Sequence, residues 1–214
     1  MPDVTAVSIA NMALSHLGAA STIESFDELS NEAVQCKLWY DIARKEVLEA
    51  FDWSFARKRA TLAEHADGPP DEWAFRYQYP ADCIMARSIW NAFGGIGVFG
   101  LVDATRLSIY QGDVIPFELE ASDAGDDLTI LTNMEDAILV YTFDQAVPAM
   151  FSSHFVKILA RNLAAKMAYS ITGKQALEDE HFKIAERLIR LAPAYDGNQH
   201  GITPPAEATW IRGR

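Results

Sequence analysis

Apolar residues recur at the spacing of an α-helix near both ends of the chain, and the spacing changes between those ends. The first helical stripe begins near Ala6 and ends at Leu17. Gly18 follows at the position where a left-handed residue closes a helix. We therefore expect a first helix over about residues 4–17.

A second helical pattern follows a polar link. Ser30 can accept hydrogen bonds from the first free backbone N–H groups, and Glu32 gives the acidic first turn that a helix dipole favours. We expect this helix to continue to about Phe51. Its apolar residues cover more than one side, which predicts contacts from two directions, one of them with another subunit. They include Val34, Leu38, Trp39, Ile42, Val47 and Leu48. The candidate residues for packing between subunits are Trp39, Leu48, Phe51 and Trp53.

Two further helices are expected near the carboxyl end. An apolar stripe starts at Phe151, continues to Ile171, and is closed by Gly173. The next segment has Glu178 in its first turn and Arg190 in its last turn, the order of charges that a helix dipole favours. We expect these two helices to form an antiparallel hairpin.

The middle of the chain lacks helical spacing, and its pattern is typical of β-strands. After the basic cluster at residues 57–59, short runs of β-branched and aromatic residues alternate with turn residues up to about residue 147. We expect six strands in a small sheet or sandwich, the last two forming a hairpin around Asn133. The expected strands are Thr61–Glu64, Phe75–Tyr79, Cys83–Trp90, Ile115–Glu120, Leu128–Thr132 and Ala137–Phe143.

Together these patterns predict an α+β fold, in which an antiparallel bundle of about four helices carries a β-rich insertion and ends in an extended C-terminal tail. The expected divisions are a first helical part (1–58), the β-rich insertion (59–147), a helical hairpin (148–195) and the tail (196–214). The tail holds Trp210 and Ile211 beside a basic end, and such residues often anchor a docking contact. A tail that folds back on its own domain is the alternative.

Composition narrows the possible partners. The 214 residues include 18 Lys and Arg against 30 Asp and Glu, a formal charge of −12. This charge disfavours a protein that wraps nucleic acid, because such proteins neutralise phosphates with basic side chains. We find no apolar run long enough for a spanning helix and no basic signal-peptide leader, so we expect no membrane partner and a soluble cytoplasmic product. Cys36 and Cys83 lack metal-binding spacing, and we expect two buried free thiols.

Motifs for catalysis or cofactor binding lack their required context. Gly95, Gly97 and Gly100 match the letters of a dinucleotide-binding loop, but no sufficiently long helix follows them, so we expect a flexible loop. The five histidines are scattered, and no nucleophile-elbow motif occurs. We therefore expect no cofactor, no metal and no enzymatic activity.

Acidic residues leave one catalytic alternative open. A glycosidase needs only two carboxylates facing a cleft, and spacing in the sequence does not test that geometry. We interpret the densest acidic run as a solvated strand edge and loop. It consists of Glu118, Glu120, Asp123, Asp126 and Asp127.

Three segments together resemble the tail tubular protein A and head-to-tail adaptor family of short-tailed bacteriophages. They are residues 13–18 (ALSHLG), residues 43–56 (ARKEVLEAFDWSFA) and residues 75–82 (FRYQYPAD). The order of helix pair, β region, helix pair and tail is also similar, so the resemblance spans nearly the whole chain.

The resemblance implies a structural virion protein of the phage tail or neck, made in the host cytoplasm. Such a subunit forms a ring, expected to hold twelve copies, between the portal protein and the tail or nozzle protein, and DNA passes through without sequence-specific binding. The C-terminal segment would reach the portal, which makes Trp210, Ile211, Arg212 and Arg214 the candidate docking residues. Two alternatives stay open: a tail-associated hydrolase of peptidoglycan or capsular polysaccharide that uses paired carboxylates, and a monomeric binding protein of the host cell.

Overall fold

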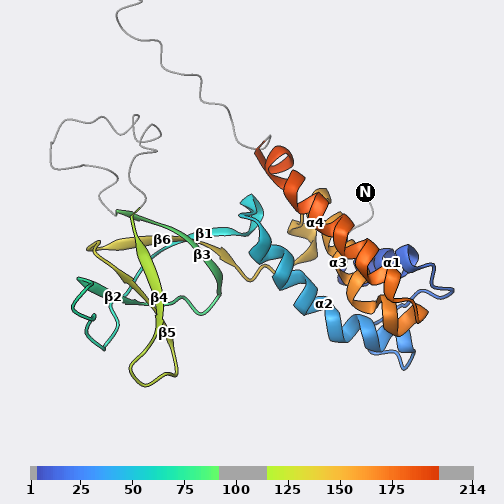
Figure 1. The fold of residues 1–214 in the computed structure, drawn as a ribbon, viewed down its shortest axis with the longest axis horizontal. Helices are drawn as coiled ribbons and strands as arrows, with labels where there is room; N and C mark the ends of the chain where they lie inside the picture. Colours follow the sequence, from blue (N-terminus) through green and yellow to red (C-terminus); the bar gives the residue numbers. More distant parts are fainter. Residues whose placement is uncertain (1–3, 92–114, 198–214) are drawn as a thin grey trace, which may run out of the picture.

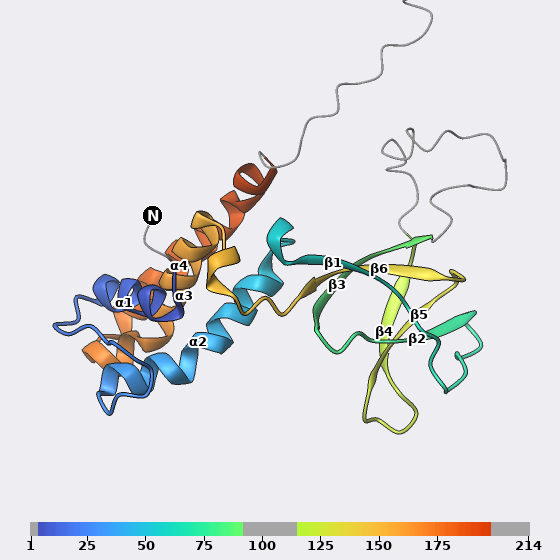
Figure 2. The same cartoon turned by 180° about the vertical axis from the view of Figure 1, so that it is seen from behind.

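The structure, a computed structural model, describes residues 4–91 and 115–197. These residues form a mixed α and β protein with four α-helices and two small antiparallel sheets. Figures 1 and 2 show the helices gathered at one end and the strands at the other, with α2 extending from the helices towards the strands. The expectation of an α+β fold is confirmed at this level.

The first two helices lie close to their expected ranges, and α1 begins two residues later than expected. Helix α1 (Ala6–Leu17) starts after Thr5, whose hydroxyl accepts from the Ser8 amide, and ends at Gly18 in the left-handed conformation with φ 69°. Helix α2 (Asn31–Ala50) starts after Ser30, whose side chain accepts from the Ala33 amide. The expected caps at Gly18 and Ser30 are therefore confirmed, and α2 positions the surface described below.

The last two helices pack on each other. Helix α3 (Ser153–Thr172) is capped by Ser152 and closed by Gly173 at φ 68°, as the apolar stripe predicts. Helix α4 (Gln175–Gly197) then runs back along α3 (Figure 1). It includes Pro193 and ends at Gly197, slightly beyond the expected end of the hairpin at residue 195. Helix α3 lies centrally, because α1, α2 and α4 all contact it.

The strands form two three-stranded sheets. In the first sheet β6 (Ala137–Phe143) lies between β1 (Arg57–Thr61) and β3 (Cys83–Asn91). In the second sheet β5 (Leu128–Thr132) lies between β2 (Phe75–Gln78) and β4 (Phe117–Ala121). The short 3-10 helices η1 (Ser54–Ala56) and η3 (Pro148–Met150) lead into β1 and α3.

Two expectations about the strands are corrected. The expected hairpin of β5 and β6 around Asn133 does not form, because each strand is the centre of a different sheet. The first strand is Arg57–Thr61 in place of Thr61–Glu64, so the basic cluster belongs to β1. It pairs with β6, with Arg59 opposite Val140. Residues 57–61 therefore form a strand because they pair with the buried strand β6, although their own sequence lacks an alternation of apolar and polar residues.

Two isolated bridges join the sheets, Glu64 with Tyr77 and Ile89 with Ile115. Side chains from both sheets then share one small core, which includes Tyr77, Ile89 and Leu139. The glycines at 94–100 and the C-terminal residues 198–214 lie outside the described residues. The interpretations placed on them, including the docking residues Trp210, Ile211, Arg212 and Arg214, stay predictions.

Candidate interaction surfaces

The most conspicuous surface is the outer face of α2. Its inner face is buried against the other helices and includes Ala43 and Val47. On the outer face Val34, Leu38 and Ile42 are 51%, 56% and 43% exposed. They follow one another at intervals of four residues, so they form one apolar stripe along the helix. We call these three residues the α2 stripe.

The apolar residues of α2 therefore occupy two sides, as the sequence indicates. The structure nevertheless changes which residues are candidates for contacts between subunits. Leu48 is 0% exposed and Trp53 is 1% exposed, so both belong to the core of the single chain. Trp53 also donates from its indole nitrogen to the Val47 carbonyl at 2.8 Å. We correct the expectation for these two residues, because neither has surface left for a neighbouring subunit. Trp39 and Phe51 are partly buried against the same core.

Arginine side chains join the helical region to the β region. Arg87 of β3 donates to three main-chain carbonyls at the end of α2, those of Leu48, Glu49 and Phe51, at 2.9 to 3.1 Å. A helix end leaves carbonyls without intrahelical partners, and a cation there also favours the helix dipole. The contact therefore fixes strand β3 at the carboxyl end of α2.

A second arginine reinforces this joint from the middle of α2. Arg44 is 3% exposed, pairs with Asp144 beyond β6, and donates to the Gln145 carbonyl at 2.8 Å. Burial alone opposes ionisation of Asp144, but Arg44 and Lys45 outweigh it and lower the pKa of that carboxyl. The joint is thus charged and hydrogen-bonded, and the sequence gives no local sign of it, since its partners lie about 100 positions apart.

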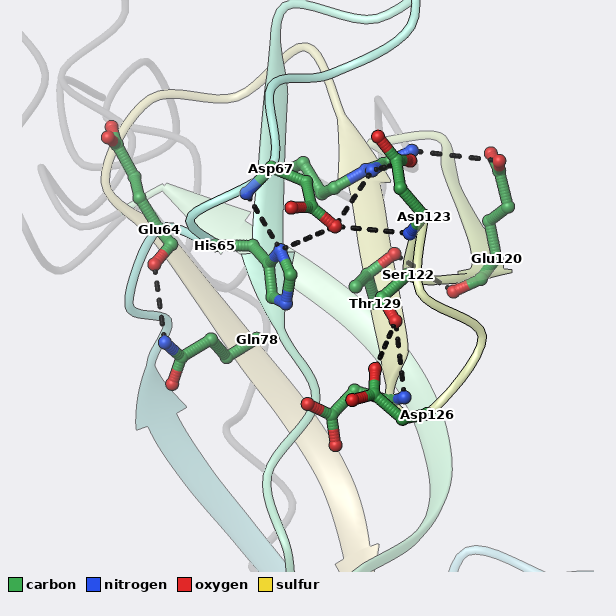
Figure 3. A network of polar contacts seen from close by, with 11 residues as sticks. Glu64, His65, Asp67, Gln78, Glu120, Ser122, Asp123, Asp126 and Thr129 are labelled. Atoms are coloured by element: carbon green, nitrogen blue, oxygen red, sulfur yellow. Dashed lines mark hydrogen bonds and ion pairs between the residues drawn. The ribbon is translucent and has the colours of Figure 1, made fainter.

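At the far end of the β region a buried arginine holds an acidic network (Figure 3). The side chain of Arg76 is 3% exposed, and its guanidinium donates to Asp123 at 2.7 Å. Asp67 and Glu120 lie 3.7 and 3.6 Å from the same guanidinium. Asp67 in turn accepts from the Asp123 amide and lies beside His65. One cation therefore draws together carboxylates from two loops and one strand.

The acidic run predicted as a strand edge and loop takes that position. Glu118 and Glu120 are on β4, and Asp123, Asp126 and Asp127 are in the turn before β5. All five are exposed. Ser122 donates to Asp126 at 2.8 Å and accepts from the Asp127 amide, which fixes the turn. The sequence could indicate the acidic edge, but it could not indicate Arg76 as the residue that organises it.

The structure bears on the paired-carboxylate alternative, because it shows in which direction the pKa of one pocket carboxyl is shifted. A pocket of about 380 Å³ beside the acidic network has Asp126 and Asp127 in its lining. A general acid in a glycosidase needs a raised pKa. The hydrogen bond from Ser122 instead lowers the pKa of Asp126. The Asp126 carboxyl of this pocket therefore lacks the raised pKa that a general acid needs.

Metal binding and thiol chemistry also find little basis in the part of the chain that the structure describes. Within residues 4–91 and 115–197, no group of three or more His, Cys, Asp or Glu side chains is arranged to hold a metal ion. Both cysteines are free; Cys36 is buried and Cys83 only partly so. Burial raises the pKa of the Cys36 thiol to about 11, which makes it a poor nucleophile at neutral pH.

No family model and no curated protein matches this chain. The resemblance to phage adaptors therefore rests on the three sequence segments and on the order of elements. None of the described helices is both long and apolar enough to cross a membrane.

Proposed function

We propose that this chain is a structural subunit of a bacteriophage head-to-tail connector, a ring between the portal and the tail or nozzle through which DNA passes. The observation that carries the proposal is the α2 stripe, because its three apolar side chains are exposed on the helix that also supplies the inner core. A ring of identical subunits needs a surface of each subunit that binds a different surface of the next. The α2 stripe is the surface we assign to that contact.

The finer fold belongs to the same proposal. We assign the four helices to an antiparallel bundle, the strands to an insertion in it, and residues 198–214 to an extended tail. The joint formed by Arg44 and Arg87 supports this assignment, since these two side chains connect the β region to α2 within one subunit. A ring that fixes the tail relative to the portal needs subunits whose two regions are firmly connected. Twelve copies is the number that the family resemblance implies.

Charge supports the passage of DNA through the ring. At −12 the chain repels phosphate on average, so DNA would pass through the ring without sequence-specific binding. A ring whose inner surface proves to be lined mainly by Lys and Arg would contradict this part of the proposal.

The subunit contact is tested by a matched pair of substitutions. Leu38→Gln places an amide in the α2 stripe, while Leu128→Gln changes an equally apolar residue that is 43% exposed on the β region. Each variant is mixed with the portal protein of the same phage, and assembly is followed by sedimentation and electron microscopy. We expect rings with Leu128→Gln and none with Leu38→Gln. Rings that form equally well with both variants would overturn the assignment of the α2 stripe.

The portal contact is tested separately. We propose that Trp210, Ile211, Arg212 and Arg214 dock on the portal, so deletion of residues 206–214 should leave a folded chain that no longer binds it. Circular dichroism checks the fold, and co-sedimentation checks binding. Binding that survives the deletion would remove the tail from the proposal but leave the α2 stripe in place.

A further inference from the structure

Three basic side chains from three helices meet on one side of the helical region. His16 comes from the last turn of α1, Arg161 from α3 and His181 from α4. The two imidazole rings have centroids 6.3 Å apart, and the Arg161 guanidinium lies 3.2 Å from Nδ1 of His181. Arg161 and His181 thus connect α3 to α4, and with His16 beside them the three helices bring together groups that carry up to three positive charges.

The protonation state of His181 follows from its partner. A guanidinium has only donors, so Nδ1 of His181 must accept, and the ring proton sits on Nε2. His181 is 3% exposed, and its Nε2 finds no hydrogen-bond partner among the described residues. A second proton would turn the accepting Nδ1 into a donor facing another donor. Acid would therefore break the hydrogen bond and add a charge beside Arg161.

The surroundings of both histidines, taken together, also disfavour their protonated forms. Burial, followed by the positive charge of Arg161, lowers the pKa of His181 below its ordinary value of 6.5. Burial and Arg161 also lower the pKa of His16, with a smaller effect from His181. The opposing influences on His181 are Glu180, on the same helix, and the main-chain carbonyl of His16. They do not reverse the shift.

We propose that His16, Arg161 and His181 form a pH-sensitive latch that holds α4 against α1 and α3 at neutral pH and releases it in mild acid. A histidine whose pKa is lowered by folding stabilises the packed state above 6.5, and this stabilisation is lost as the pH falls through the folded value. Between pH 6.5 and the lowered folded pKa, the ratio of packed to released α4 should therefore fall by up to about tenfold per pH unit for each histidine, and it should level off below the folded pKa.

The latch is independent of the proposed role in a phage ring. Helix α4 leads directly to residues 198–214, so the latch would couple acidity to the point where that segment begins. The test needs only the full chain in solution. Its failure would leave the connector proposal unchanged, and the reverse also holds.

The experiment compares His181→Gln with His65→Gln. Glutamine keeps an oxygen that can accept from Arg161 but does not titrate, and His65 lies beside Asp67 in the β region, away from the latch. Amide hydrogen exchange of α4 is measured from pH 7.5 to 5.0, after correction for the intrinsic exchange rate. We expect α4 to open more readily in acid in the unmodified chain and in His65→Gln, and His181→Gln to lose most of that dependence. The same pH dependence in all three proteins would overturn the latch.

A second measurement covers the case in which His181→Gln does not fold. The Cε1–H resonance of His181 is titrated by NMR in the unmodified chain and in Arg161→Met. Loss of the positive neighbour should raise the pKa of His181, which a merely space-filling Arg161 would not do. A midpoint at or above 6.5 in the unmodified chain, or no change in Arg161→Met, would contradict the proposal.

Discussion

The helical and β regions are held together by different physics. Among the described residues the main helical cluster contains 25 buried apolar residues, and the cluster between the two sheets contains 8. Apolar burial contributes stability in proportion to area, so the helical region has the larger reserve. The β region supplements its small core with buried polar groups. Thr129 and Thr132 are 0% exposed, and their hydroxyls donate to main-chain carbonyls across the strand pair.

This difference indicates which amino-acid substitutions each region tolerates. A large apolar core loses stability when a side chain is shortened, whereas a small core backed by hydrogen bonds depends on geometry at particular polar contacts. The joint between the two regions combines both kinds of contact, because the polar contacts of Arg44 on α2 and Arg87 on β3 are made at a helix whose inner face belongs to the large apolar core. Substitutions in the core, at the joint, at a helix end and on the outer surface should therefore have effects of decreasing size.

The largest effect is expected for Trp53→Ala in the helical core. Trp53 is 1% exposed and its ring packs on Phe51, Phe55 and Phe155. Its removal should lower the free energy of unfolding by about 3–5 kcal/mol, measured by urea denaturation. Trp90 in the β region is 49% exposed, so Trp90→Ala should cost clearly less. Equal losses from the two variants would contradict the burial of Trp53 in the helical core.

The next effect is expected at the joint. Arg44→Met removes the buried cation that pairs with Asp144 and donates to the Gln145 carbonyl. We expect a loss of about 2 kcal/mol in the free energy of unfolding, the usual range for hydrogen bonds to charged groups. Residual dipolar couplings should also show the two regions less firmly aligned. An unaltered alignment would mean that Arg87 alone fixes the joint.

A smaller effect is expected at the start of α3. The hydroxyl of Ser152 accepts from the Phe155 amide at 3.2 Å and caps the central helix. Ser152→Ala should cost about 1 kcal/mol of stability, while Ser152→Asp, which retains an acceptor, should cost less. Thermal denaturation of the two variants measures the difference. Identical losses would show that the cap contributes nothing at this position.

The smallest change in stability is expected on the outer face of α2. Leu38 is 56% exposed and Leu48, on the same helix, is 0% exposed. Leu38→Ala should change the free energy of unfolding by less than about 0.5 kcal/mol. Leu48→Ala should lower it by about 2–5 kcal/mol. A large loss from Leu38→Ala in the isolated chain would show that the α2 stripe already has a partner within its own subunit.

The helices were predictable because their signals are local. Gly18, Ser30 and Gly173 mark helix ends through the conformation or hydrogen bonding of one residue, and each does so in the structure. Strand partners were not predictable in this way. β5 and β6 are neighbours in sequence but belong to different sheets: β5 pairs with β4 and with the more distant β2, whereas both partners of β6, β1 and β3, are distant in the chain.

The candidate surface was predictable only in outline. The pattern of α2 indicates two apolar sides, yet it does not say which side faces the core. Large aromatic residues suggested an interface at Trp53, but that ring fills the space between helices, and the smaller Val34 and Ile42 are the exposed ones. The contacts of Arg76 and Arg87 join residues far apart in sequence, so no local sequence pattern predicts them.

The most direct test of the proposed subunit contact is a cryo-electron microscopy map of the full chain assembled on the portal protein of its phage. The account predicts a closed ring in which Val34, Leu38 and Ile42 of each subunit are covered by a neighbouring copy. A map in which these three side chains face solvent, or in which the chain sits on the particle as isolated single subunits, would contradict it.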